Sequence, residues 1–278
     1  MFTRILKTCL VSGIATLLLG CGGGSDTLGP SVSEIKAQAP LSYGQKATLV
    51  IAGKYMRSDM VADTGSCTNP SFSTQSSPDV VALSCNVTAV GALPIAIKAA
   101  DGTVLYSTTL TVPLPQVTVL TSKGVIVLEL NPSAAPKTVN NFLTYVSNGY
   151  YKGTLFHRVI AGFVVQGGGY TTGMVKKDGQ RAPIALESNN GLTNTRSTLA
   201  MARTSDANSA TSEFFVNLAD NTSLDYQNVN SPGYAVFGKV VSGMDVVDAI
   251  AAVPTGSVGG VTDIPTTDVT VSLAFQSK

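Results

Sequence analysis

The stretch of sequence that decides the fold is residues 156–168, FHRVIAGFVVQGG. Its apolar, β-branched residues and its glycines are typical of short strands and tight turns. An arginine (Arg158), a glutamine (Gln166) and the only histidine of the 278 residues (His157) lie among them. Three further stretches are considered together with this one. They read LAMAR at 199–203, SEFFVN at 212–217 and GYAVFGKV at 233–240, and the last one leads into GMDVVD at 243–248.

The elements around these stretches complete a mainly-β pattern. Residues 117–120 and 125–130 predict two strands joined by a turn at 122–124. A helix is predicted to begin at Pro136 and to end near Gly149, and a second one covers 243–253 before Pro254. Because strands dominate and only two helices are expected, the second half of the chain is predicted to be a barrel-like β fold with helical caps.

The order and spacing of these motifs resemble those of bacterial cyclophilins over roughly Val117 to Phe275. The resemblance implies a closed, eight-stranded antiparallel β-barrel capped by two helices. It also implies peptidyl-prolyl cis-trans isomerase (rotamase) activity, which requires no cofactor and no metal. The partners would be proline-containing unfolded or exported polypeptides, because slow exchange about X-Pro bonds can limit protein folding.

By this resemblance the catalytic residues are Arg158, Phe163 and Gln166. Rotation about an X-Pro bond breaks amide resonance and leaves a lone pair on the prolyl nitrogen. A guanidinium that is always charged can favour this twisted state without transferring a proton, and Arg158 is therefore assigned that role. Gln166 would bind the backbone of the substrate.

The same resemblance implies a set of substrate-binding residues around the catalytic ones. Phe163 would share the proline pocket with two of them, two would line the groove for the residue before proline, and one would lie at the edge of the pocket. On the residues alone, the apolar members are more readily interpreted as barrel core. The set comprises Phe215 and Leu224 (pocket), Ala202 and Arg203 (groove), Val164 (edge), Glu213 and Tyr234.

Three positions depart from the family pattern. Glu213 stands where the family usually has glutamine, and its carboxylate could either orient the Arg158 guanidinium or neutralise part of its charge. Ser223 replaces the tryptophan of cyclosporin-sensitive members, and Tyr234 replaces a histidine that such members often have. These two changes predict weak cyclosporin binding.

The single histidine is interpreted as structural. A Ser-His-Asp hydrolase would have to use His157, but the chain has no Gly-x-Ser-x-Gly elbow. His157 and Arg158 are neighbours on what should be one strand, so their side chains are expected on opposite faces.

The N-terminus resembles the signal of a bacterial lipoprotein. A short basic region precedes an apolar stretch at 8–19, which is too short to span a membrane comfortably, and Leu18-Leu19-Gly20-Cys21 resembles a lipobox. This implies lipidation of Cys21, which would anchor the chain to the bacterial envelope facing the periplasm. The outer membrane is favoured over the inner one because no aspartate follows Cys21. An ordinary signal peptide with a chance cysteine is the alternative.

The first half of the mature chain is predicted to be a separate module. Cys67 and Cys85 would be its two cysteines, and an oxidising compartment favours a disulfide between them. Apolar runs at 47–53, 93–98 and 103–112, with Asp101-Gly102 as a hairpin turn, predict a small β-sandwich. The expected organisation is a signal peptide (1–20), a flexible tether (21–29), an immunoglobulin-like β-sandwich (30–115) and an isomerase domain (116–278).

Composition limits the other possibilities. A formal net charge of +1 and 13% charged residues give no support to nucleic-acid binding. A single histidine excludes a metal site with two or more histidines. None of the expected features requires a second copy of the chain, so a monomer is expected. Two alternatives to an isomerase assisting the folding of envelope proteins stay open here: a proline-peptide-binding chaperone module with little turnover, and an envelope scaffold or adhesion lipoprotein.

Overall fold

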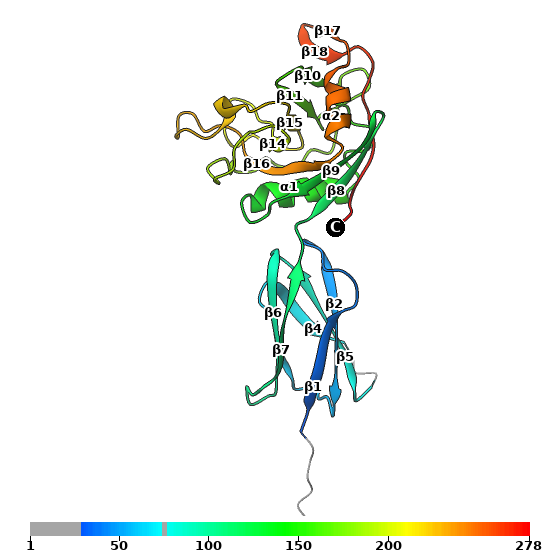
Figure 1. The fold of residues 1–278 in the computed structure, drawn as a ribbon, viewed down its shortest axis with the longest axis vertical. Coiled ribbons are helices and arrows are strands. Elements are labelled where there is room, and N and C mark those ends of the chain that lie inside the picture. Colours follow the sequence, from blue (N-terminus) through cyan, green and yellow to red (C-terminus); the bar gives the residue numbers. More distant parts are fainter. Residues whose placement is uncertain (1–28, 74–76) are drawn as a thin grey trace, which may run out of the picture.

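The computed structural model describes residues 29–73 and 77–278. The predicted signal peptide, Cys21 and the predicted tether up to residue 28 lie outside the described residues. The described chain forms an N-terminal and a C-terminal part, which meet near the segment 113–115 (Figure 1). No helix within the two described ranges is long and apolar enough to cross a membrane.

The N-terminal part consists of strands in two antiparallel sheets, ordered β1-β2-β5-β4 and β3-β6-β7. Alternate residues of the strands are buried, for example Leu49 and Ile51 in β2 and Ile95 and Ile97 in β6, as expected when one face of each sheet covers a core. The strands are β1 (Ser31–Ala37), β2 (Lys46–Lys54), β3 (Val61–Asp63), β4 (Cys67–Phe72), β5 (Val80–Val87), β6 (Gly91–Lys98) and β7 (Val104–Val112).

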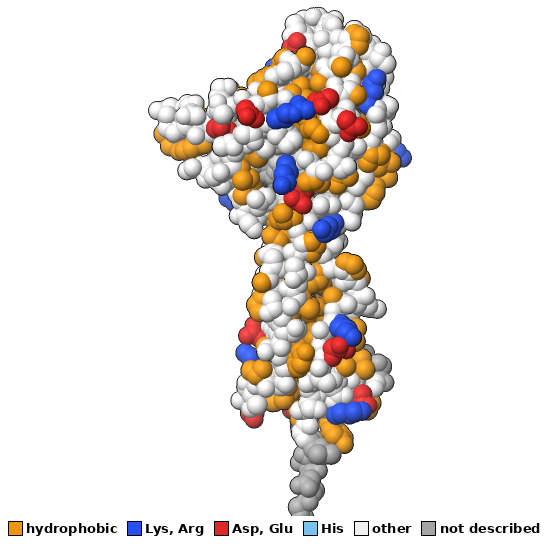
Figure 2. Space-filling view, in the orientation of Figure 1, with side chains coloured by type: hydrophobic (Ala, Val, Ile, Leu, Met, Phe, Trp, Pro, Cys, Tyr) orange, Lys and Arg blue, Asp and Glu red, His pale blue; other side chains and the backbone are white. Residues whose placement is uncertain are grey.

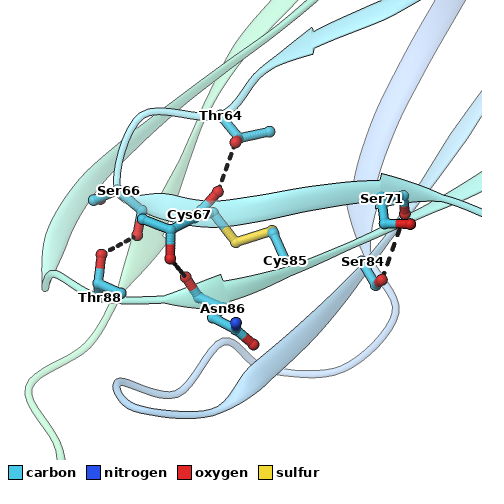
Figure 3. Close-up of a disulfide and its surroundings, with 9 residues drawn as sticks. Thr64, Ser66, Cys67, Ser71, Ser84, Cys85, Asn86 and Thr88 are labelled. Atoms are coloured by element: carbon cyan, nitrogen blue, oxygen red, sulfur yellow. Dashed lines mark hydrogen bonds between the residues drawn. A yellow bond between two sulfur atoms is a disulfide. The ribbon is translucent and has the colours of Figure 1, made fainter.

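A disulfide joins Cys67 of β4 to Cys85 of β5, with 5.3 Å between the two Cα atoms (Figure 3). Both cysteines are buried. The Thr64 hydroxyl donates to the Cys67 carbonyl at 2.6 Å, and the Thr88 hydroxyl donates to the Ser66 carbonyl at 2.7 Å. The bridge therefore fixes a polar strand that has little apolar surface of its own to hold it.

The C-terminal part is built on an eight-stranded antiparallel sheet in the order β10-β11-β15-β14-β16-β9-β8-β19. The sheet curls, and backbone hydrogen bonds link segments next to its two edge strands: Gly153 donates to Val271 (2.7 Å) and Phe156 donates to Val269 (2.9 Å). The prediction of a mainly-β chain with two α-helices is confirmed for the described residues. The elements are β8 (Gln116–Thr121), β9 (Gly124–Leu130), α1 (Pro136–Ser147), β10 (Arg158–Ile160), β11 (Val164–Gly167), β12 (Tyr170–Thr171), β13 (Val175–Lys176), β14 (Thr198–Met201), β15 (Phe214–Asn217), the 3₁₀ turn η1 (Thr222–Leu224), β16 (Val236–Ser242), α2 (Met244–Ala251), β17 (Thr255–Val258), β18 (Val261–Pro265) and β19 (Val271–Gln276).

The two helices begin in different ways. Helix α1 starts at Pro136, and its free N-terminal amides are covered by the carboxylate of Glu187, which accepts from Lys137 N at 3.1 Å and from Thr138 N at 2.9 Å. Helix α2 follows Gly243, whose φ is +84°. A Cβ at this position would lie 2.2 Å from the Val125 carbonyl oxygen, so glycine is required where the helix meets β9.

Polar contacts connect the two parts at a waist that is narrower than either part (Figure 2). The buried Tyr43 donates its hydroxyl to Asn140 of α1 at 2.9 Å. Gln276 of β19 donates to the Tyr43 carbonyl at 3.0 Å and accepts from Gln45 at 3.2 Å. Burial, with the negative charge of Glu187, raises the pKa of Tyr43 above its ordinary value, so this hydroxyl stays a donor.

Candidate active site

The strand register brings the polar and aromatic candidates of the site into one row. Arg158 of β10 lies opposite Gln166 of β11, and Gln166 lies opposite Phe215 of β15. Phe215 in turn lies opposite Ala200, which lies opposite Val236. Directly opposed residues of antiparallel strands point to the same face of a sheet, so Arg158, Gln166 and Phe215 project together. We call these five residues the cross-strand row.

This face of the sheet holds a pocket of about 200 Å³, which we call the apolar pocket. Every residue predicted to be catalytic or substrate-binding lines it, except Glu213. Glu213 lies in a neighbouring hollow, which shares Gln166, Ala202 and Arg203 with the apolar pocket. The lining consists of Arg158, Phe163, Val164, Gln166, Ala202, Arg203, Phe215, Leu224 and Tyr234.

One wall of the apolar pocket is a stack of aromatic and cationic groups. The rings of Phe215 and Tyr234 meet edge to face, with 5.6 Å between their centroids. The Arg203 guanidinium carbon lies 4.6 Å from the centroid of Tyr234, and Arg203 Nε donates to the Gly233 carbonyl at 2.9 Å. Arg203 is therefore held against this wall, which leaves Arg158 as the other cation of the pocket lining.

Three asparagines that the sequence analysis did not single out hold the floor of the pocket. Asn221 donates to the Phe163 carbonyl at 2.9 Å, and Asn194 donates to the Leu224 carbonyl at 3.1 Å. Asn217 links the two, because it donates to Asn194 and accepts from Asn221. Nothing in the spacing of these asparagines indicated that they would meet.

The Arg158 guanidinium reaches the pocket without a direct ionic partner. Its Nη1 donates to Gln166 Oε1 at 3.3 Å. Within the described part of the chain, no carboxylate oxygen lies within 4.0 Å of its nitrogens. Gln166 Nε2 donates to Glu213 Oε2 at 2.8 Å, so Glu213 reaches Arg158 only through Gln166.

Glu213 is held as a carboxylate. Burial on its own raises its pKa, but hydrogen bonds from His157 and Gln166 and the positive charge of Lys176 outweigh burial and lower the pKa below the ordinary value. His157 Nε2 lies 3.3 Å from Glu213 Oε2. His157 and Arg158 were expected to share a strand and to point to opposite faces, but only Arg158 belongs to β10. His157 precedes the first residue of β10, so strand alternation does not govern its side chain.

The site offers an apolar pocket, a guanidinium at its edge and amide groups beside it, an arrangement suited to binding and polarising a neutral group. The described residues include no group of three or more His, Cys, Asp or Glu side chains placed to hold a metal ion.

Comparison with known proteins places the match on the C-terminal part. The family model described as "Cyclophilin type peptidyl-prolyl cis-trans isomerase/CLD" matches residues 116–274. The peptidyl-prolyl cis-trans isomerase cyp18 of Streptomyces antibioticus is 54% identical over 156 residues, which are 55% of this chain and 93% of that protein. Peptidyl-prolyl cis-trans isomerase B of Escherichia coli is 50% identical over 164 residues, which are 58% of this chain and 99% of that protein. A crystal structure of a cyclophilin-type isomerase from Cryptosporidium parvum, obtained in the presence of the dipeptide Ala-Pro, covers 59% of this chain and 99% of its own at 28% identity and a TM-score of 0.50.

Proposed function

This chain belongs to the family of cyclophilin-type peptidyl-prolyl cis-trans isomerases, and from that premise we propose how its own residues turn an X-Pro bond. The protein is an enzyme that accelerates cis-trans exchange about peptidyl-prolyl bonds. The uncatalysed barrier is about 18–20 kcal/mol, because the C–N bond has partial double-bond character. The site must therefore bind the twisted amide more tightly than either planar form.

In this proposal the proline ring of the substrate enters the apolar pocket and packs on Phe163, Phe215 and Leu224. Arg158 at the edge of the pocket then meets the proline carbonyl and the prolyl nitrogen. The nitrogen becomes pyramidal and exposes its lone pair as the bond twists, and a guanidinium N–H stabilises that lone pair. No covalent bond is made or broken, so neither a nucleophile nor a general base is required.

The observation that supports this mechanism most directly is the placement of Arg158. Its guanidinium lies in the same lining as the apolar side chains, and no carboxylate is paired with it there. The charge is thus available to the substrate. Gln166 and the groove residues Ala202 and Arg203 would bind the backbone on either side of proline.

The test is turnover of an Ala-Pro peptide by a chain beginning at Gly29, compared with its Arg158→Ala variant. We expect kcat/KM to fall by roughly 10²–10³-fold, as when a single transition-state hydrogen-bond donor is removed. Peptide binding, measured by titration, should change little because the apolar pocket is intact. Full turnover by Arg158→Ala would contradict the role of Arg158.

We also propose that the enzyme is a monomeric, lipid-anchored protein of the bacterial envelope that acts on exported proline-containing polypeptides. The lipobox at Cys21 supports the anchor, and the disulfide between Cys67 and Cys85 is consistent with an oxidising compartment. Strand β1 begins at the end of the N-terminal part that is remote from the C-terminal part (Figure 1). On this proposal the N-terminal part is a spacer between membrane and active site.

Two structural proposals belong to this picture. The N-terminal part would be an immunoglobulin-like β-sandwich, which its two antiparallel sheets and its buried disulfide support. The C-terminal sheet would behave as a closed barrel, which the hydrogen bonds between 153–156 and 269–271 support.

The location is tested by expressing the full chain and its Cys21→Ser variant in a bacterium and separating the membranes. The full chain should sediment with the membranes and incorporate labelled palmitate, and the variant should do neither. A variant that stays in the membrane fraction would contradict the lipid anchor.

A further inference from the structure

A line of polar contacts connects the catalytic guanidinium to a histidine that the mechanism above does not use. Arg158 Nη1 donates to Gln166 Oε1 (3.3 Å), and Gln166 Nε2 donates to Glu213 Oε2 (2.8 Å). His157 Nε2 lies 3.3 Å from that same carboxylate oxygen. The contacts therefore connect Arg158 to His157, the residue that precedes it in the sequence.

The carboxylate decides which way the Gln166 amide faces. A primary amide has a donor end and an acceptor end, and either could turn toward a neutral partner. A carboxylate accepts only, so the NH₂ group of Gln166 must face Glu213. The Gln166 oxygen is then left to face Arg158, which can only donate.

The contact with this carboxylate compensates for the burial of the His157 imidazole. The residue is 6% exposed, and its ring lies 4.6 Å from that of Tyr170. Its Nδ1 is buried and has no hydrogen-bond partner among the residues that the structure describes. Burying an imidazole is costly unless it is hydrogen-bonded, and the contact with Glu213 is the polar contact that its ring makes.

The carboxylate also occupies space that the missing side chain of Gly169 leaves open. A Cβ added to Gly169 would lie 2.5 Å from Glu213 Oε1 and 2.6 Å from its carboxyl carbon, so any larger residue at 169 would push the carboxylate away. Lys176 and Arg203 are the charged groups that share the hollow with Glu213, and Lys176 adds to the stabilisation of its charge. The contact with His157 and the absence of a side chain at Gly169 thus both favour this position of the carboxylate.

We propose that His157 is a positioning residue of the isomerase, which holds Glu213 in place and through it fixes the Gln166 amide and the Arg158 guanidinium at the apolar pocket. This inference rests on the role proposed above for Arg158. A guanidinium that leans on a fixed amide oxygen is already oriented before the substrate twists, so its orientation costs nothing further in the transition state. The contribution of His157 should then appear more strongly in kcat than in peptide affinity.

The experiment compares turnover of an Ala-Pro peptide by the chain from Gly29 with that by two variants that disturb Glu213 in different ways. His157→Phe keeps a ring and removes the donor, and Gly169→Ala adds the Cβ that meets the carboxylate. We expect each to lower kcat about tenfold, on the scale that small misplacements of a catalytic group produce, and to weaken peptide affinity by a smaller factor, since Gln166 also binds the substrate backbone. His157→Gln, which can still donate an N–H to Glu213, should restore part of kcat.

A matched control separates positioning from loss of structure. Thr154 is also fully buried in the C-terminal part, but its hydroxyl donates to the Tyr151 carbonyl, away from Glu213. Thr154→Val should lower the unfolding midpoint without changing kcat of the folded protein. The side-chain amide resonances of Gln166 should shift in His157→Phe and Gly169→Ala but not in Thr154→Val.

The decisive comparison places His157→Phe in an Arg158→Lys background, where the planar guanidinium that Gln166 supports is absent. If His157 acts through Arg158, the substitution should cost no further kcat there. An equal loss in both backgrounds, or an unchanged kcat in the parent, would overturn the proposal. If the Arg158→Ala variant of the preceding section keeps full turnover, the mechanism proposed for Arg158 fails instead, and the positioning role of His157 fails with it.

Discussion

At the scale of single residues, the site depends on the ionised carboxylate of Glu213. Glu213 takes the place of a neutral amide in the family pattern, and the structure gives it two donors and a nearby cation. Its pKa is therefore lower in the folded chain than in the unfolded one. The carboxylate contributes to stability fully above the unfolded pKa of about 4.3, and this contribution is lost as the pH falls through the lower folded value.

This shift predicts a specific dependence of stability on pH. The difference in free energy of unfolding between the parent chain and Glu213→Gln should not shrink between pH 7 and about pH 5, and it should shrink only below about pH 4.3. Urea titrations of both proteins across that range measure it. A difference that already shrinks between pH 7 and pH 5 would show that the pKa of Glu213 is raised by burial rather than lowered by its partners.

A second residue-scale prediction concerns an inhibitor. Ser223 is exposed in the turn η1, next to the pocket residue Leu224, where cyclosporin-sensitive members of the family carry tryptophan. The indole donor and its apolar surface are both absent there, so we expect cyclosporin to bind weakly. Titration with cyclosporin while following turnover tests this, and Ser223→Trp should tighten the binding. Nanomolar inhibition of the parent chain would refute the prediction.

The family resemblance predicted the residues of the apolar pocket, all but Leu224 inside the quoted motifs, but the sequence did not predict their supports. The asparagines that hold Phe163 and Leu224 meet through folding of separate loops. The contact between His157 and Glu213 depends on the side chain of a residue just outside a strand, where alternation gives no guidance. Such contacts follow from tertiary packing and have no local pattern.

At the scale of elements, helix α1 likewise has features that the sequence predicted and features that it did not. Its start at Pro136 and its apolar face could be predicted from spacing. Its N-terminal cap could not, because the residue before Pro136 is Ala135, which offers no side-chain acceptor, and the carboxylate comes from Glu187, far along the chain. Strand β4 was also not predicted: it contains Pro70 and polar residues, and its pairing with β5 is secured by the disulfide instead of by an apolar pattern.

The distant cap makes a prediction about α1. Glu187→Ala removes the acceptor of Lys137 N, Thr138 N and the Thr138 hydroxyl, and should lower the free energy of unfolding by about 1–2 kcal/mol. Glu187→Gln keeps an acceptor and loses the charge that favours a helix N-terminus, so it should lie between the two. Urea unfolding of the three proteins measures this. An unchanged midpoint for Glu187→Ala would mean that water replaces the carboxylate without cost.

At the scale of the whole molecule, the two parts are joined by few polar contacts around Tyr43 and Gln276. The apolar pocket lies in the C-terminal part, and the family model matches residues 116–274. On the proposed function, the junction sets how the active site is presented and takes no part in turnover.

A double substitution tests whether the junction affects the arrangement of the two parts but not turnover. Tyr43→Phe with Gln276→Ala removes the hydrogen bonds of the Tyr43 hydroxyl and of the Gln276 side chain, and should broaden the distribution of shapes seen by small-angle X-ray scattering. Turnover of a short Ala-Pro peptide should stay within twofold of the parent, since no pocket residue is altered. A large loss of turnover would instead show that the N-terminal part supports the site.

The cross-strand row also determines when during folding the protein becomes an enzyme. Its members extend from Arg158 to Val236, and the strands that bear them pair out of sequence order, with β14 between β15 and β16. Such pairings between residues far apart in the sequence form slowly. Closing the long loop between them costs chain entropy before any contact provides stabilisation. A nascent or partly translocated chain that ends before Tyr234 therefore has no complete pocket. In refolding experiments, catalytic competence should therefore return only after β14 has paired with both β15 and β16.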